Sequence, residues 1–281
     1  MRPVRRIVAA AVSAVLMVVP AAADPPRRVA SLNLSADEVL VEILPLDRLV
    51  AVTAQLDEKG MSNAIGRVPK SVTRFFRADL ERLLVLRPDL VVVSEYTDPD
   101  FLRQLERSGI PHHRMQGLRT LAGYRQAILD LGRATGAAAG AERLVARYDA
   151  SLRDLARRLE GAPRPRVLYW ASGMTAGADS AIGALVECGG GRNVGAELGL
   201  SGIVPIAGER AFAADPDVVL VGVWPGVVDS LRGDPLLKNL RAVREGRVVE
   251  MPTELLVAVS QHAAEACRDL ASRLHPSRVP R

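Results

Sequence analysis

Two glutamates, Glu81 and Glu209, open two near-copies of one segment, ERLLVLRPDLVVV and ERAFAADPDVVLV. In both copies the glutamate precedes a Pro-Asp pair at the same spacing, and an unbroken apolar run follows. The residue before a proline is disfavoured in a helix, so each copy predicts a short helix followed by a strand. Carboxylates on two matching helices can pair with two cationic groups of a partner. The repeat therefore predicts an acidic contact presented twice, suited to docking onto a two-fold symmetric surface.

A second set of residues with binding chemistry follows the predicted strands: Asn33, Ser35, Phe75, Arg77, Tyr96, Trp170, Thr175 and Trp224. Aromatic residues make up only 4% of the chain, so their position at strand ends is informative. Flat side chains can bind a large amphipathic ligand through apolar area, and the loops after strands surround the ligand crevice of α/β sheets. Each aromatic residue is also consistent with a place in the core.

Metal binding and catalysis fit the sequence less well. The four histidines are scattered, and we expect His112 and His113, which follow a Gly-Ile-Pro turn, to be exposed loop residues. No G-x-S-x-G elbow, P-loop or G-x-G-x-x-G turn is found, so we do not expect an enzyme, and we expect no cofactor. A binding site for a bare ion such as zinc or manganese, which needs converging His, Asp or Glu ligands, stays open as an alternative.

The elements that must position these residues follow one plan twice. β-branched-rich runs without polar alternation are typical of parallel strands buried on both faces. Such strands are predicted in the RVAS segment before Asn33 and at Arg48–Thr53, Val91–Val93, Arg166–Trp170 and Val218–Val221. After the first strand a helix is expected, which Ser35 or Asp37 could cap. We predict an α/β fold of two Rossmann-like lobes, each with a central, mostly parallel sheet.

A long amphipathic helix is predicted between the halves, over about residues 139–160. Its apolar residues recur every three or four positions from Ala141 to Leu159, which makes one helical stripe. At 1.5 Å per residue the helix would be about 33 Å long and could join the two lobes rigidly. We divide the rest into an N-terminal lobe (24–118), a helix pair that includes this helix (119–163) and a C-terminal lobe (164–281).

The first residues, 1–23, read as a secretory signal peptide with cleavage near Ala23. They combine a basic start, an apolar stretch too short to cross a bilayer comfortably, and small residues before the cleavage site. Without them 34 basic and 32 acidic residues remain, so the net charge of +5 falls to +2. This balance argues against nucleic-acid binding. We expect a periplasmic protein that acts as a monomer.

Cys188 and Cys267 are the two cysteines of the chain. In an exported protein a disulfide between them is the economical interpretation, and two separate buried thiols are the alternative.

The order of these motifs resembles the periplasmic substrate-binding proteins of ABC importers for cobalamin and iron complexes, including siderophores and heme. The resemblance runs from RVASLNLSADEVLVEI through DRLVAVT, ADLERLLVLRPDLVVV, CGGGRN and PDVVLV to NLRAVREGRVV, nearly the whole chain. It implies a ligand held between the lobes and a membrane permease dimer as partner. It also implies that Glu81 and Glu209 occupy the positions of the family's glutamates that pair with permease arginines.

The resemblance extends to the cysteines, because cobalamin-binding members carry cysteines at positions equivalent to Cys188 and Cys267. This favours the disulfide and, mildly, a corrinoid ligand. The three ligand classes differ in chemistry. Heme needs an axial ligand such as Tyr96, an anionic ferric siderophore needs arginines such as Arg77, and cobalamin needs aromatic side chains and backbone hydrogen bonds. The sequence leaves the choice among them open.

Overall fold

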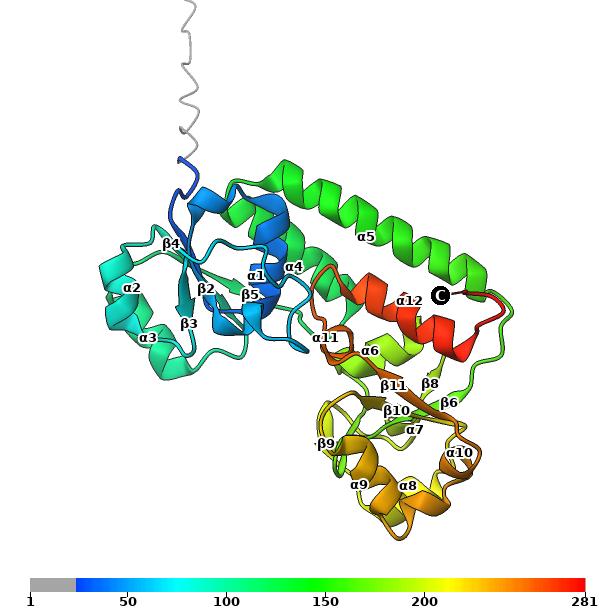
Figure 1. Cartoon of the computed structure of the whole chain (residues 1–281). Coiled ribbons are helices and arrows are strands. Elements are labelled where there is room, and N and C mark those ends of the chain that lie inside the picture. Colours follow the sequence, from blue (N-terminus) through cyan, green and yellow to red (C-terminus); the bar gives the residue numbers. More distant parts are fainter. Residues whose placement is uncertain (1–23, 281) are drawn as a thin grey trace, which may run out of the picture.

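The computed structural model describes residues 24–280, so the predicted signal peptide lies outside the described residues (Figure 1). The chain forms two α/β lobes, one after the other, with one long helix running beside both. Across the part described, no helix has the length and apolar character needed to cross a membrane.

The N-terminal lobe is built on a five-stranded parallel sheet with the order β3-β2-β1-β4-β5. Its strands are β1 (Val29–Ser31), β2 (Leu49–Thr53), β3 (Thr73–Phe75), β4 (Leu90–Ser94) and β5 (His112–Met115). Its helices are α1 (Leu34–Ile43), α2 (Leu80–Leu86), α3 (Pro99–Arg107) and α4 (Leu121–Ala134), with short 3-10 turns η1 (Leu46–Arg48) and η2 (Ala54–Asp57). Every residue of β4 is buried, as expected of a central parallel strand.

The C-terminal lobe repeats this arrangement with the parallel order β11-β10-β6-β8. Its strands are β6 (Arg166–Tyr169), β8 (Arg192–Asn193), β10 (Val218–Gly222) and β11 (Val248–Met251), and β7 (Met174–Ala176) pairs antiparallel with β9 (Ile203–Pro205). Its helices are α6 (Ala181–Cys188), α7 (Val194–Glu197), α8 (Gly208–Ala213), α9 (Val227–Gly233), α10 (Arg241–Arg244), α11 (Thr253–Leu256) and α12 (Ala263–Leu274), with the 3-10 turn η3 (Leu237–Asn239). The α/β fold with two parallel sheets is confirmed.

The long helix α5 (Ala138–Leu159) joins the lobes by packing into both of their cores. Leu144 and Tyr148 belong to the apolar cluster of the N-terminal lobe, whereas Leu155 belongs to a cluster of the C-terminal lobe. α5 also packs against α4 and α12, and Figure 1 shows it running along both lobes with α12 beside it. The apolar stripe seen in the sequence is therefore the buried face of a bridging helix.

The duplicated segments form the same structure in both lobes: a short helix, α2 or α8, followed by a central strand, β4 or β10. In each lobe the aspartate of the Pro-Asp pair contacts an arginine at the beginning of the first strand, a contact that we call the clasp. Asp89 accepts hydrogen bonds from the main-chain N–H groups of Arg27 (2.7 Å) and Arg28 (2.8 Å), and Asp217 accepts one from the N–H of Arg166 (2.9 Å). The guanidinium groups of Arg28 and Arg166 bind carbonyls at the ends of α2 and α8, including those of Leu86 and Ala214. The Pro-Asp pair thus anchors each helix to the first strand of its lobe.

Two local predictions differ from the structure. The helix α1 is capped by Asn33, whose side chain accepts from the N–H of Ala36 (2.9 Å), and not by Ser35 or Asp37. His112 and His113 lie in β5 and are partly buried, since the chain enters the edge of the sheet directly after the Gly-Ile-Pro turn. Burial lowers the pKa of His113.

Candidate ligand-binding cleft

A pocket of about 490 Å³ lies between the two lobes. Its N-terminal wall comes from the carboxyl ends of β1 and β4, where Asn33, Ser35 and Tyr96 line it. These two strands are the neighbours at which the strand order of the sheet reverses, and ligands of open α/β sheets bind at that point. Three of the eight residues predicted from the sequence are therefore brought together here.

The loops after β4 and β5 are fastened to each other at this wall. Glu95 accepts a hydrogen bond from the N–H of Leu118 (2.7 Å), and the Tyr96 hydroxyl accepts one from Nε of Arg119 (3.1 Å). The hydrogen bond to Tyr96 raises the pKa of Arg119, and the negative charge of Asp179 acts in the same direction. Tyr96 is 60% exposed, so its ring is a preformed flat surface in the cleft.

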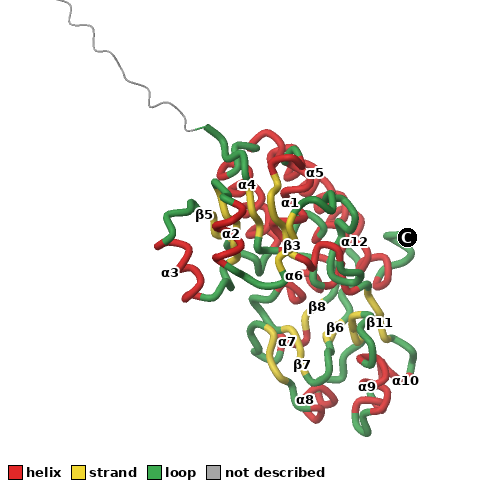
Figure 2. Tube along the Cα trace, turned by 60° about the vertical axis from the view of Figure 1, so that its left-hand side comes forward, coloured by secondary structure: helices red, strands yellow, loops and turns green. Residues whose placement is uncertain are grey.

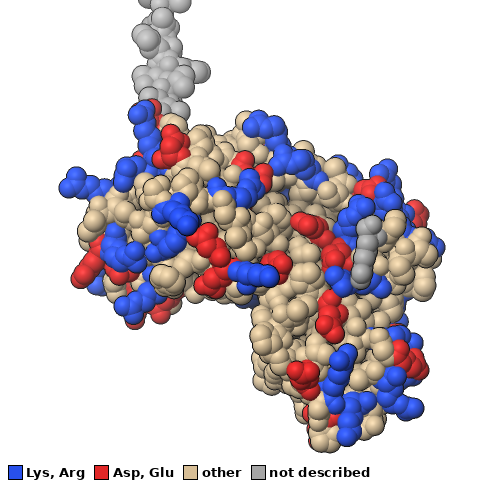
Figure 3. Space-filling view, in the orientation of Figure 1, with Lys and Arg blue, Asp and Glu red and all other residues tan. Residues whose placement is uncertain are grey.

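The C-terminal wall is apolar for the most part. It includes Ile182, Ile203, Leu256, Val257 and Val259. In Figure 3 the flank of the C-terminal lobe that faces the N-terminal lobe is mostly free of charged side chains.

Asp179 and Ser180 add polar groups to this wall. Ser180 caps α6 by accepting from the N–H of Gly183 (3.0 Å), and Asp179 just before it adopts a positive φ of 50°. The charged groups that line the pocket are Arg119 and Asp179, one from each lobe, so the lining has no net formal charge.

The other five predicted ligand residues do not line this pocket. Phe75 is 3% exposed and packs in the core of its lobe under the guanidinium of Arg82 (4.7 Å to the ring centroid). The neighbouring Phe76 is 85% exposed instead, because successive side chains of an extended chain point to opposite sides. Arg77 is exposed outside the pocket.

Trp170 and Thr175 are likewise buried, in the core of the C-terminal lobe. Trp170 follows β6 and packs with residues of β10, and Thr175 uses its hydroxyl to bind the carbonyl of Tyr169 (2.8 Å). Trp224 is partly buried and packs against a core cluster of the C-terminal lobe that includes Leu256. The strand-end rule placed these residues near the cleft but could not predict on which side of the strand each ring lies.

Sequence reasoning missed Arg119 of the N-terminal wall and most of the C-terminal wall. Arg119 could have been found, because it follows β5 in the same way that Tyr96 follows β4. Ile203, Val257 and Val259 come from β9 and from the loop after α11, and their sequence carries no signal that separates them from core residues.

The two glutamates of the repeat are exposed in the first turns of α2 and α8. Figures 1 and 2 show these helices on different lobes, well apart in both views. Leu83 and Ala211, two residues further on in each copy, are fully buried, so each helix keeps its glutamate in solvent by burying the opposite face. Within residues 24–280, no group of three or more His, Cys, Asp or Glu side chains is placed to hold a metal ion.

Cys188 and Cys267 form a disulfide, with their Cα atoms 5.5 Å apart, which confirms that prediction. The bond joins the end of α6, which begins at the cleft, to α12, which packs on the bridging helix. It therefore ties one wall of the cleft to the helices that hold the lobes together.

Asp37 lies on α1 behind the cleft, fully buried, and accepts hydrogen bonds from the N–H (2.9 Å) and hydroxyl of Thr53. Burial raises its pKa to about 7, although the hydrogen bonds from Thr53 oppose the shift. The folded protein therefore keeps a proton that the unfolded chain has already lost, and this group's contribution to stability is lost as pH rises from about 4 through about 7.

We expect Asp37→Asn to remove this pH dependence, because the amide stays neutral throughout. Between pH 5 and pH 8 the free energy of unfolding of the wild type should fall relative to the variant by on the order of 1 to 3 kcal/mol. Urea unfolding of both proteins at the two pH values measures the difference. Equal changes in wild type and variant would show that Asp37 is ionised in the folded protein at both pH values.

Two α/β lobes of like topology, a bridging helix that packs into both and a pocket lined from both sides define a two-lobe solute-binding protein. Comparison with known families identifies the group: the family model described as periplasmic binding protein matches residues 29–255, and the chain belongs to this family.

Individual relatives agree with this placement. The chain is 27% identical over 267 residues to a cobalamin-binding protein of Halobacterium salinarum, covering 90% of this chain and 71% of that protein. It is 22% identical over 274 residues to an uncharacterized ABC transporter substrate-binding lipoprotein of Bacillus subtilis, covering 89% and 81%. Among solved structures it resembles the apo periplasmic heme-binding protein RhuT of Roseiflexus, with a TM-score of 0.75, 25% identity and coverage of 90% and 99%.

Proposed function

We propose that this protein captures a metal chelate, cobalamin or a ferric siderophore, in the periplasm and delivers it to the permease of an ABC importer. The observation that carries the proposal is the pocket between the lobes, with apolar walls, an exposed tyrosine ring and no net formal charge in its lining. Its ligand is carried rather than transformed, because the fold and family are those of solute-binding proteins.

Within this class the pocket favours a corrinoid. A ligand with little net charge and a large apolar surface needs apolar area and a few hydrogen-bonding groups. The pocket supplies both, through residues such as Ile203, Val257 and Tyr96, and through Asn33 and Ser35. An anionic siderophore would need several unpaired cations, whereas Arg119 already binds Tyr96 and has Asp179 nearby. The cobalamin-binding relative supports the same choice.

Heme is the second candidate, and one observation favours it. Tyr96 presents its hydroxyl at the cleft, and a phenolate is a known axial ligand of heme iron. Nε of Arg119 donates to that oxygen, which would stabilise its negative charge. The solved heme-binding neighbour has the same fold.

Delivery requires a permease, and the two exposed glutamates are the contacts we propose for it. Glu81 and Glu209 stand at equivalent places on α2 and α8, so a partner with two symmetric cationic sites would meet both at once. Such contacts between exposed charges act mainly on the rate and register of docking. Export directed by the N-terminal segment would place the protein in the periplasm, where it would capture its ligand and dock onto the permease.

Calorimetric titration of the mature, oxidised protein with cyanocobalamin, hemin and a ferric hydroxamate siderophore tests the proposal. We expect saturable one-to-one binding of cyanocobalamin with a Kd in the micromolar range or below. Tyr96→Ala should weaken it about tenfold through lost aromatic area, while Tyr96→Phe should leave it almost unchanged. Arg77→Ala, an exposed arginine outside the pocket, is the matched control.

The outcomes separate the candidates. Binding of hemin with a tyrosinate-type absorption spectrum that Tyr96→Phe abolishes would replace the corrinoid by heme. Binding of the siderophore that depends on Arg119 would identify the anionic class. Absence of binding to all three would overturn the metal-chelate proposal.

A further inference from the structure

Glu38 is a buried carboxylate that binds both lobes. It lies on α1 and is 2% exposed. Its Oε1 accepts hydrogen bonds from the main-chain N–H (2.8 Å) and side-chain Nδ2 (3.0 Å) of Asn63, in the N-terminal lobe. Its Oε2 accepts a hydrogen bond from the hydroxyl of Ser260, which lies between α11 and α12 of the C-terminal lobe. Glu38 and Ser260 are 222 positions apart in the sequence.

Two further bonds surround this contact. The amide of Gln261 donates to the main-chain carbonyl of Glu38 (2.8 Å), and Nδ2 of Asn63 also donates to the carbonyl of Glu254 (3.0 Å). The segment from Glu254 to Gln261 is therefore held against the N-terminal lobe at both of its ends, by Asn63 at one end and by α1 at the other. All of these groups are polar and buried or partly buried, so each lost partner would leave an unsatisfied group.

Both sides of this contact lead directly to the ligand cleft. α1 begins at the cleft, where Asn33 and Ser35 line the N-terminal wall. The segment held by Glu38 contains Leu256, Val257 and Val259 of the C-terminal wall. A bond between α1 and this segment consequently fixes the distance between the two walls.

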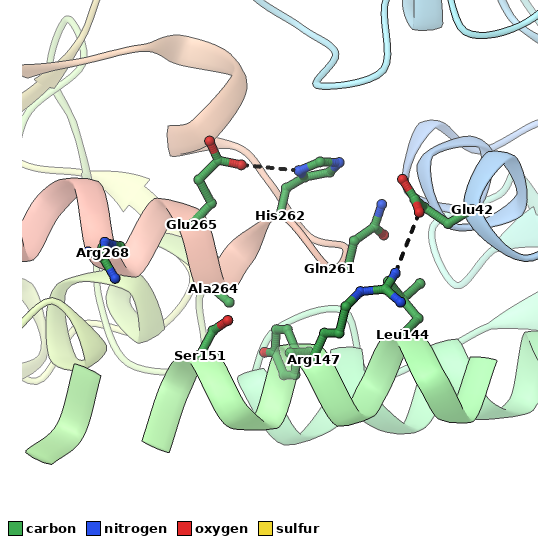
Figure 4. Close-up of a pocket in the computed structure, with 10 residues that line it drawn as sticks. Glu42, Leu144, Arg147, Ser151, Gln261, His262, Ala264, Glu265 and Arg268 are labelled. Atoms are coloured by element: carbon green, nitrogen blue, oxygen red, sulfur yellow. Dashed lines mark hydrogen bonds and ion pairs between the residues drawn. The ribbon is translucent and has the colours of Figure 1, made fainter. Parts of the chain in front are cut away.

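The surface near Glu38 is hollowed between helices of both lobes. A groove of about 410 Å³ separates α1, α5 and α12 there (Figure 4). Oε2 of Glu42, one turn after Glu38, lies 3.6 Å from the guanidinium of Arg147 on α5. Oε2 of Glu265 on α12 lies 3.4 Å from Nδ1 of His262, directly before that helix. The small residues Ala263 and Ala264 pack against the N-terminal core beside it.

We propose that Glu38 is a latch that sets the width of the ligand cleft, with Asn63 and Ser260 as its two partners. It is a positioning residue, since it does not line the pocket and acts through α1 and the segment after α11. The spacing of the lobes is a property of the free protein, and only the effect on ligand affinity rests on the proposed function.

Substitutions of Glu38 can distinguish a role of its hydrogen bonds from a role of its negative charge. Glutamine can keep the same contacts, because its oxygen can accept from Asn63 while its NH₂ group donates to the Ser260 hydroxyl, which can also accept. Alanine can keep none of them. Ser260→Ala removes the hydrogen bond that the C-terminal lobe donates to Glu38, and it changes no side chain of the N-terminal lobe.

Distances between spin labels at Arg103→Cys on α3 and Arg232→Cys on α9 test the latch by double electron-electron resonance. Both side chains are more than half exposed, at 56% and 62%, and lie on different lobes. We expect Glu38→Ala and Ser260→Ala to broaden the distance distribution, and Glu38→Gln to restore the wild-type one. Glu42→Ala, which removes an acid one turn away on the same helix, should change nothing.

Binding of cyanocobalamin to the unlabelled variants provides the second readout. Ser260→Ala should weaken it by up to about tenfold, because conformations of other lobe spacing, no longer opposed by this hydrogen bond, would compete with the binding-competent one. An unchanged distance distribution in Ser260→Ala would overturn the latch. Because Ser260→Ala leaves Glu38 in place, it tests the proposal even if Glu38→Ala does not fold. A wild type that fails to bind cyanocobalamin would refute the corrinoid proposal, and the distance measurement would still decide the latch.

Discussion

Reversal of both repeat glutamates, by Glu81→Lys with Glu209→Lys, is expected to reduce ligand transport at least about a hundredfold while leaving ligand affinity unchanged. Each lysine would place a positive charge against the cationic group that we propose on the permease, and like charges across an interface cost several kcal/mol. Both glutamates are exposed and lie outside the pocket, so neither the fold nor the cleft should change.

Uptake of labelled ligand into vesicles that contain the cognate permease measures the effect. The matched control is Glu106→Lys with Glu245→Lys, which changes the net charge equally at two other exposed glutamates, one on each lobe. Single reversals should give intermediate rates, and the wild-type rate should fall with salt because exposed charge pairs are screened. Transport by the double variant at the wild-type rate would rule out docking through these residues.

Loss of the disulfide is expected to produce the largest change in stability. The bond closes a loop with a sequence separation of 79 residues, which corresponds to about 4 to 5 kcal/mol in the chain-entropy model. Cys188→Ala with Cys267→Ala should therefore lower the free energy of unfolding by up to about that amount. Because Cys267 is fully buried against α6, part of the loss would come from packing.

Urea unfolding of the double variant, beside the wild type with and without reductant, tests this expectation. The reduced wild type keeps both sulfur atoms, so the difference between it and the variant isolates packing from the cross-link. A loss below about 1 kcal/mol would mean that the unfolded chain gains little freedom when the bond is absent.

The sequence predicted the fold well because its signals were local and repeated. The apolar runs around Val91–Val93 and Val218–Val221 are buried central strands, and the single apolar stripe of α5 contributes residues to both cores. The exposed glutamates could also be predicted, since a short amphipathic helix leaves one face in solvent.

The candidate cleft could be predicted only in part. Asn33, Ser35 and Tyr96 were found because strand ends at the switch point meet in one place. The rings of Phe75 and Trp170 point into the cores, which depends on the twist and packing of each strand end and not on residue type. The latch of Glu38 joins segments far apart in sequence, so no local pattern predicts it.

The clasp between Arg28 and Asp89 has a mechanical consequence. The side chain of Arg28 is bonded to the last carbonyls of α2, and the same residue leads into β1, which ends next to Asn33 in the cleft. β1 has three residues, so about 10 Å of hydrogen-bonded strand separates the end of the glutamate helix from the cleft. A force applied to Glu81 would therefore be transmitted along β1 to the N-terminal wall of the cleft at Asn33.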